Sequence, residues 1–145
     1  MTNSKNIAIL FPIYSGDSVN YLNQAIDSII NQDYPGRITF IFCIDGPISE
    51  ELKACYNSIN NAVILELKTN QGLATNLNQG IQYALENNYS FIARMDADDI
   101  STKDRIRKQY DFFINNPTAS IVGTGCNIID KDNNLVGQRI PKSKI

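Results

Sequence analysis

The run Ile38-Thr-Phe-Ile-Phe-Cys-Ile-Asp-Gly-Pro47 predicts a buried β-strand that ends in a turn. Apart from Thr39, every residue up to Ile44 is apolar, and a short continuous run of this kind is typical of a strand inside a sheet. Asp45-Gly46-Pro47 closes the strand, because glycine and proline favour turns. Such a strand needs cover on its faces, so the neighbouring segments decide the architecture.

Similar apolar runs alternate with stretches of helical period on both sides of this strand. In residues 19–30, for example, apolar side chains recur at steps of three and four. Strands are expected at residues 7–11, 38–44, 62–67 and 90–95, and helices at residues 19–30, 50–60 after a cap at Ser49, 73–85, and up to residue 114 after a cap at Ser101 or Thr102. This alternation predicts an α/β fold of three layers, α/β/α, in which a mostly parallel sheet carries helices on both faces.

The C-terminal stretch has a different pattern. Residues 120–129 predict a fifth strand, and residues 130–134 predict a turn that leads into a weaker strand at Leu135-Val136. A chain of 145 residues is about the size of one domain. We therefore expect residues 1–145 to form a single domain.

The charge balance and the missing histidines exclude several classes of function. Thirteen Lys and Arg face fifteen Asp and Glu, and the basic residues form no dense stripe, so nucleic acid is not an expected partner. The sequence contains no histidine, which excludes a Ser-His-Asp triad, a Cys-His pair and a histidine zinc site. Any chemistry must rest on carboxylates, amides, hydroxyls, lysines or a metal.

The apolar run near the N-terminus is too short to cross a membrane. It covers residues 7–14, whereas a spanning helix needs roughly 20 apolar residues, and no small-residue cleavage site follows it. The three cysteines show no CxxC spacing, which fits a reducing compartment. We expect no transmembrane segment in this chain and a cytoplasmic location, either free or peripheral at the inner membrane face.

Polar residues follow each of the first four predicted strands. In parallel α/β sheets, ligands bind beyond the carboxyl ends of the strands, so these residues are expected to line one crevice. They are Tyr14, Asp45, Asn70 with Gly72, and the run Asp96-Ala-Asp98-Asp99.

The acidic run is the most informative of these segments. If the chain is extended there, Asp96 and Asp98 point the same way. Two unit charges ~4 Å apart cost about 4 kcal/mol at an effective dielectric constant near 20, so the pair needs a counter-charge. Mg²⁺ or Mn²⁺ would supply it and would hold a diphosphate in the same crevice. The alternative is a solvated acidic turn in which Asp99 caps the following helix.

Several segments, in this order and spacing, resemble the N-terminal part of a family 2 glycosyltransferase over nearly the whole chain. This family has the GT-A fold, a Rossmann-like fold of nucleotide-diphospho-sugar transferases. The segments are Pro12-Ile-Tyr14, Ile44-Asp-Gly46, residues 70–80, residues 94–101 followed by Arg105, and Ile121-Val-Gly123.

The resemblance implies that a sugar is transferred, with inversion, from a nucleotide-diphospho-sugar donor to an acceptor hydroxyl. A UDP-sugar is the favoured donor, and the acceptor is expected to be a saccharide or a lipid-linked molecule. By the same resemblance, Asp98 binds Mn²⁺ or Mg²⁺ directly, Asp96 contacts the ribose or a metal-bound water, and Asp99 assists. Bacterial surface polysaccharide synthesis is the expected pathway.

The resemblance also implies a set of donor-binding residues. Asp45 accepts a hydrogen bond from the nucleobase, and Pro12 and Tyr14 form the wall on which the base lies. Packing of Tyr14 in the core is the alternative for that residue. Asn70 and Gly72 contact the donor or, alternatively, are structural: an amide that caps its own turn and a glycine that lets the backbone approach closely.

The chain departs from the family pattern in two respects. Asn76-Leu77 stands where many relatives have Ala-Arg, which puts a basic contact to the nucleotide in doubt. Family members normally continue into an acceptor-binding half that carries the general base. No base is located here, because a turn explains Asp130 and Asp132. We expect this chain to bind donor and metal, and robust transfer to need the continuation.

Two other functions are compatible with the sequence. One is a non-catalytic nucleotide-binding module on the same fold. The other is an aspartate-dependent phosphatase, since an Asp-x-Asp pair after a strand occurs there too. In this chain the pair Asp96-x-Asp98 follows the fourth strand rather than the first, which disfavours the phosphatase.

Overall fold

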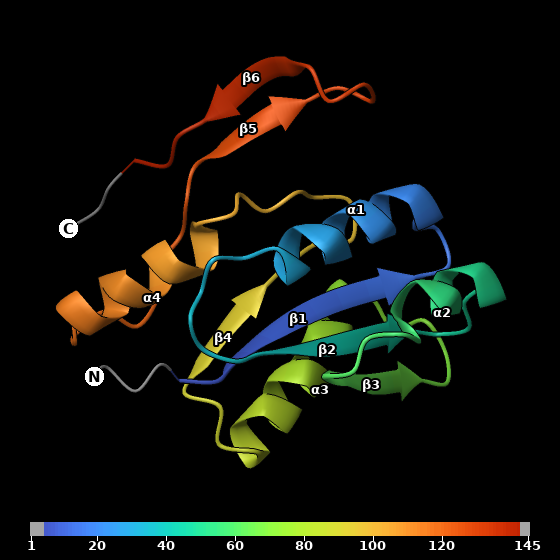
Figure 1. Ribbon diagram of the computed structural model, residues 1–145. Coiled ribbons are helices and arrows are strands. Elements are labelled where there is room, and N and C mark those ends of the chain that lie inside the picture. The colour runs from blue at the N-terminus through green and yellow to red at the C-terminus, as the bar shows by residue number, and fades with distance from the viewer. Residues whose placement is uncertain (1–4, 143–145) are drawn as a thin grey trace. The chain divides into compact units, whose positions relative to one another are not determined.

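The computed structural model describes residues 5–142, which fold into alternating strands and helices (Figure 1). The elements are β1 (Ile7–Tyr14), α1 (Val19–Ile30), β2 (Ile38–Asp45), α2 (Glu50–Tyr56), β3 (Ala62–Leu67), α3 (Leu73–Glu86), β4 (Phe91–Arg94), α4 (Arg105–Asn115), β5 (Cys126–Ile129) and β6 (Leu135–Arg139). The first four strands form one parallel sheet in the order β3-β2-β1-β4. The expected α/β fold with a mostly parallel sheet is confirmed.

The contacts divide the chain into two compact units, one ending at Arg107 and one beginning at Lys108. The second unit contains the antiparallel hairpin β5-β6. The strand expected from residue 120 begins only at Cys126 and pairs with β6 alone. Gly123 and Gly125 interrupt the stretch before it, and glycine weakens a strand. The expected single domain stays a prediction.

Both faces of the parallel sheet are covered by helices. Successive side chains of a strand point to opposite faces, so alternate residues of β2 belong to two separate cores. On one face Phe42 stacks on Tyr56 of α2, with ring centroids 4.9 Å apart. On the other face Cys43 belongs to a buried cluster with Leu10 and Ala84 of α3. In Figure 1, α1 and α3 accordingly lie on opposite sides of the sheet.

The face of helix α3 that packs on the sheet is not the face that carries its regularly spaced leucines. Leu73, Leu77, Ile81 and Leu85 recur one turn apart, yet Leu73 is 49% and Leu85 is 64% exposed. The fully buried residues are instead Asn76, Gly80 and Ala84. Within residues 5–142, no helix combines the length and apolar character needed to cross a bilayer.

Close approach of α3 to the sheet explains why small residues face inward. A Cβ atom at Gly80 would lie 2.6 Å from Cys43 Sγ and 3.1 Å from Leu10 Cδ2. Both distances are shorter than a normal van der Waals contact between heavy atoms. Only glycine therefore allows α3 to lie this close to β1 and β2.

We predict that Gly80→Ala lowers the free energy of unfolding. Overpacking costs about 1–3 kcal/mol, whereas the better helix propensity of alanine stabilises the protein by at most about 1 kcal/mol. Urea unfolding of the single variant and of the double variant with Cys43→Ala measures the effect. Since Cys43→Ala removes the Sγ atom, Gly80→Ala should cost less in that background. Strictly additive losses would show that the two residues do not collide.

Candidate functional site

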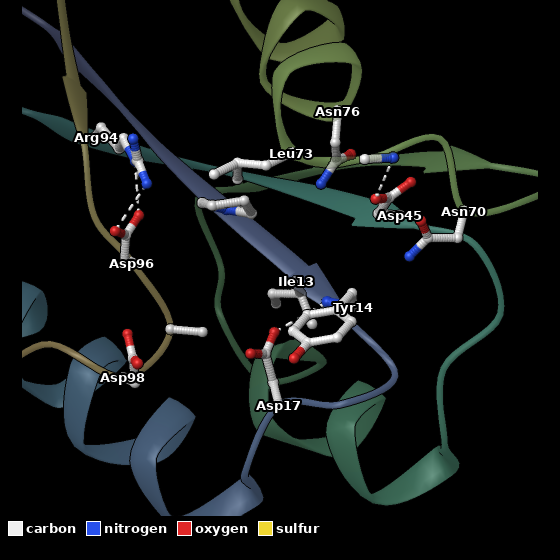
Figure 2. Close-up of a pocket in the computed structure, with 13 residues that line it drawn as sticks. Ile13, Tyr14, Asp17, Asp45, Asn70, Leu73, Asn76, Arg94, Asp96 and Asp98 are labelled. Atoms are coloured by element: carbon white, nitrogen blue, oxygen red, sulfur yellow. Dashed lines mark hydrogen bonds and ion pairs between the residues drawn. The ribbon is translucent and has the colours of Figure 1, made fainter.

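A cavity of about 410 Å³ opens at the carboxyl ends of the parallel strands. Figure 2 shows its lining side chains, which come from the ends of β1, β2 and β4 and from the start of α3. The structure brings together seven of the eight predicted site residues here; Asp99 is not among the lining residues. The lining residues are Pro12, Ile13, Tyr14, Asp17, Asp45, Asn70, Gly72, Leu73, Asn76, Arg94, Asp96, Ala97 and Asp98.

Tyr14 presents its ring to the cavity at the end of β1 (Figure 2). Its side chain is 48% exposed, so the alternative that it packs in the core is wrong. Its backbone N–H donates to Asp17 Oδ2 over 2.9 Å. A side chain at Gly16 would collide with the ring, so glycine makes room for it there. The loop after β1 thus holds an aromatic face towards the site.

Asp45 joins the end of β2 to the loop before α3. Its carboxylate is 5% exposed and accepts two backbone hydrogen bonds, from Gln71 N to Oδ1 over 2.7 Å and from Gly72 N to Oδ2 over 2.9 Å. Next to it, Gly46 has a φ of +84°, and a Cβ atom there would lie 2.7 Å from Asn70 N. The close backbone approach expected at Gly72 therefore occurs at Gly46.

Gly72 is needed for its backbone conformation. It is the N-cap residue of α3 with a φ of +88°, and nothing lies within 4 Å of a Cβ atom built on it. No side-chain hydrogen bond caps the N-terminus of α3, and the alternative that Asn70 caps its own turn stays a prediction. The positive end of the α3 dipole faces the cavity beside Gly72 and Leu73.

We predict that Asp45→Asn destabilises the protein in the absence of any ligand. An amide has one acceptor oxygen, so one of the two backbone N–H groups loses its partner, at a cost of about 1–3 kcal/mol. Guanidinium unfolding measures the change, with Asp98→Asn as the matched control. Because Asp98 is exposed, its variant should stay within about 0.5 kcal/mol of the wild type. Equal stability of the two variants would contradict the structural role of Asp45.

The acidic run after β4 is a turn. Asp99 N donates to Asp96 O over 3.3 Å, so the extended geometry expected for Asp96 and Asp98 is wrong. The reason is that β4 already ends at Arg94 and no strand pairing continues through the run. Both side chains nevertheless line the cavity (Figure 2).

Arg94 supplies a counter-charge to Asp96. Its Nε donates to Oδ1 over 2.6 Å and its Nη2 to Oδ2 over 2.8 Å, which is a bidentate ion pair. Arg94 was not among the site residues predicted from the sequence. The available signal was the spacing of two residues, which places both side chains on the same side of an extended chain.

Asp17 is another lining residue that was not predicted from the sequence. Partial burial raises the pKa of its carboxyl, the charges of Asp98 and Asp96 raise it further, and the hydrogen bond from Tyr14 N opposes them. The loop after β1 therefore adds a carboxylate to the two from the acidic run. Its position after the first strand, at the same sheet edge as the other site residues, was the signal that could have found it.

We predict that Asp17→Asn raises the free energy of unfolding at pH 7. The pKa of Asp17 is raised in the folded state, so its ionised form is disfavoured there; Asn avoids this and keeps an acceptor for Tyr14 N. The advantage shrinks as the pH falls through the raised pKa towards the usual 3.8, and is lost below it. Urea unfolding across this range measures it, with exposed Asp132→Asn as control. A pH-independent difference would contradict the argument.

Arg105 lies behind the acidic turn. Its Nη2 donates to Arg94 O over 2.8 Å, and its burial lowers the pKa of the guanidinium. Partial burial, together with the charges of Asp96 and Asp98, raises the pKa of Asp99, against the effect of the two arginines. Asp99 does not cap the next helix, because α4 begins only at Arg105. That alternative for Asp99 is wrong.

Asn76 and Leu73 of α3 also line the cavity. Asn76 is 1% exposed and donates from Nδ2 to Cys43 O over 2.6 Å. Its Oδ1 accepts from Gln79 Nε2 over 2.6 Å. The sequence carries no clear signal for this contact, because the apolar period of α3 indicates another side of the helix. Leu73 contributes an apolar surface beside it.

The oxygen donors beside the cavity suit a hard divalent cation. Among the described residues no three Asp, Glu, Cys or His side chains are gathered as a ready-made metal site. Mg²⁺ is typically held by one or two carboxylates, with waters and substrate phosphates completing its coordination. Asp98, which is exposed, and Asp96 are carboxylates of this kind at the cavity wall. The donor set therefore fits a cation that binds together with a diphosphate.

Comparison with known sequences places the chain in a family. Residues 8–143 match the family model described as glycosyl transferase family 2, and the chain belongs to that family. One relative is the amylovoran biosynthesis glycosyltransferase AmsE of Erwinia amylovora, which is 30% identical over 139 residues, covering 94% of this chain and 51% of the relative. The chain thus spans about half the length of the first curated relatives it matches.

Solved structures confirm the GT-A fold. S. aureus TarS 1–349 in complex with UDP has a TM-score of 0.65 at 17% identity, covering 89% of this chain and 43% of that one. The mannosyltransferase PcManGT from Pyrobaculum calidifontis in complex with GDP-Man and Mn²⁺ has a TM-score of 0.56 at 14% identity, covering 90% and 37%. At these identities the similarity concerns the fold alone.

Proposed function

We propose that this chain is the donor-binding part of an inverting, metal-dependent glycosyltransferase that acts in bacterial surface polysaccharide synthesis. The cavity binds a nucleotide-diphospho-sugar, with a UDP-sugar favoured, and the sugar passes to the hydroxyl of a saccharide or a lipid-linked acceptor. The observation that carries the proposal is one cavity with an aromatic face, a buried carboxylate and a pair of acids at neighbouring strand ends. Its volume lies within the usual range for small-molecule sites, roughly 300–1,000 Å³.

The end of the cavity near Tyr14 and Asp45 suits the nucleobase. An aromatic face stacks on a base, and Pro12 extends the same wall. A carboxylate offers about four acceptor positions, and the backbone of residues 71 and 72 uses two of those on Asp45. A further acceptor position is therefore left for a base N–H.

The opposite end suits the diphosphate. Asp98 and Asp96 would hold Mn²⁺ or Mg²⁺, which supplies Lewis-acid stabilisation to the departing nucleoside diphosphate. The N-terminus of α3 lies nearer Asp45, because Gly72 N donates to that carboxylate, and it adds a positive dipole end to the same cavity. Arg94 adds a positive charge that offsets part of the acidic cluster formed by Asp17, Asp96 and Asp98.

We propose that robust transfer needs a general base supplied by a chain longer than this one. The first relatives are about twice as long. Asp130 has a structural role in the β5-β6 turn, where its Oδ1 accepts from the backbone N–H groups of Asp132 and Asn134. The hydrogen bond from Asn134 lowers the pKa of the Asp130 carboxyl. A group that holds its negative charge so readily is a poor base.

Of the two alternatives, the non-catalytic nucleotide-binding module predicts the same cavity and differs only in lacking turnover. The phosphatase requires a free aspartate nucleophile after the strand. Both carboxylate oxygens of Asp96 instead accept hydrogen bonds from Arg94. The guanidinium offsets the negative charge of Asp96 and weakens it as a nucleophile, while further acceptor positions of the carboxylate are left for a binding role.

Calorimetric titration with UDP, GDP and ADP, first with Mn²⁺ and then with the metal chelated, tests the proposal. We predict that one nucleotide binds only with Mn²⁺, and that Asp98→Ala weakens this binding at least about tenfold, or ~1.4 kcal/mol. Asp132→Ala removes an exposed acid of the β5-β6 turn and should leave binding unchanged. Nucleotide binding without metal, or wild-type affinity in Asp98→Ala, would contradict the proposal. Binding without sugar transfer by the full-length protein would favour the non-catalytic module.

A further inference from the structure

Gln32, two residues after the end of α1, connects this helix to the segment that follows the acidic turn. Its Nε2 lies 2.7 Å from Thr102 O, 2.9 Å from Ser28 O and 3.2 Å from Ser101 Oγ, and its two N–H groups are shared among these three acceptors. Its Oε1 accepts from the backbone N–H of Ile106 over 3.0 Å. One side-chain amide therefore joins three parts of the fold.

Neighbouring contacts strengthen the same connection. Ser101 N donates to Ser28 Oγ over 3.0 Å, and Asp33 N donates to Lys103 O over 2.9 Å. Arg107 forms a bidentate ion pair with Asp33, with distances of 3.1 and 3.0 Å. Residues 101–107 are thus attached along the C-terminal end of α1 by both side-chain and backbone bonds.

This attachment defines one end of the acidic turn, and β4 defines the other. At the β4 end, Met95 N donates to Leu10 O over 2.9 Å. Only residues 96–100 lie between Met95 and Ser101, and Ser101 is buried and donates from its backbone N to Ser28 Oγ of α1. Because the span is so short, a shift of residues 101–106 must move the carboxylates of Asp96 and Asp98 as well. Binding groups must be held within about 0.5 Å of their productive positions to work efficiently.

We propose that Gln32 is a positioning residue, whose amide holds residues 101–106 against α1 and thereby keeps the acidic turn at the cavity. The inference rests on the proposed function, since it concerns metal-dependent binding of the nucleotide. Gln32 does not line the cavity and acts only through the turn.

The two ends of the amide have separate tasks, and this makes the proposal testable. The donor Nε2 contacts the segment after the turn, whereas the acceptor Oε1 serves the first turn of α4. Glutamate in place of Gln32 keeps an acceptor for the Ile106 N–H and adds a charge that a helix N-terminus favours. It loses the donor and places an oxygen near two carbonyl oxygens. Methionine, of similar length, loses both functions.

The experiment compares Gln32→Glu and Gln32→Met with the wild type, and uses Gln24→Glu on the same helix as the control for charge. UDP with Mn²⁺ is titrated by calorimetry, amide hydrogen exchange of residues 96–106 is measured without ligand, and thermal unfolding is recorded. For Gln32→Glu we expect a lower melting temperature, because an oxygen replaces the donor beside two carbonyl oxygens, together with faster exchange in residues 96–106 and about tenfold weaker binding. Gln32→Met should also unfold at a lower temperature. Gln24→Glu should match the wild type in all three.

The outcomes separate the inference from the function on which it rests. If the wild type binds UDP and Gln32→Glu binds it equally well with unchanged exchange, Gln32 only caps α4 and the inference is wrong. If the wild type binds no nucleoside diphosphate with Mn²⁺, the proposed function fails. In that case faster exchange of residues 96–106 in Gln32→Glu still supports the attachment, and unchanged exchange overturns it.

Discussion

The eight-residue parallel pairing of β1 with β2 is the constraint on which the rest of the site depends. Its register sets Tyr14 beside Asp45 at the carboxyl ends of the two strands. On the other side of β1, pairing of Leu10 with Arg94 brings the end of β4 to the same edge. Because parallel strands all finish at one edge, each loop that follows them contributes polar groups to a single cavity. Aromatic, carboxylate and arginine side chains far apart in the chain meet there.

Much of this arrangement could be predicted from the sequence, because apolar periodicity reports strands and helices and the residues after each strand are then known. Most of the candidate site, including Tyr14 and Asp45, was found in this way. The missing part consists of long-range hydrogen bonds, such as those of Gln32 with residues 101–106, which leave no periodic signal. The buried side of α3 was also hidden, since it follows from the close approach at Gly80 and not from the leucines.

The site carries more negative than positive charge within a small volume. Asp17, Asp96 and Asp98 interact closely enough that two of them raise the pKa of the third. Arg94 and Arg105 lie at the β4 side and neutralise part of this charge. The remaining excess is the electrostatic basis for expecting a divalent cation to bind there. Arg105 is only half-buried, so both arginines lie near the surface of this edge.

Asp45 links recognition to folding. If this carboxylate reads the nucleobase, it does so while it also holds the backbone of residues 71 and 72. Replacing it to change the preferred base would therefore loosen the start of α3. A change of donor preference, in evolution or in engineering, is easier at another lining residue such as Asn70. Its substitution leaves the hydrogen bonds of Asp45 with residues 71 and 72 intact. Donor preference within this scaffold should then diverge at the periphery of the base pocket while its centre stays fixed.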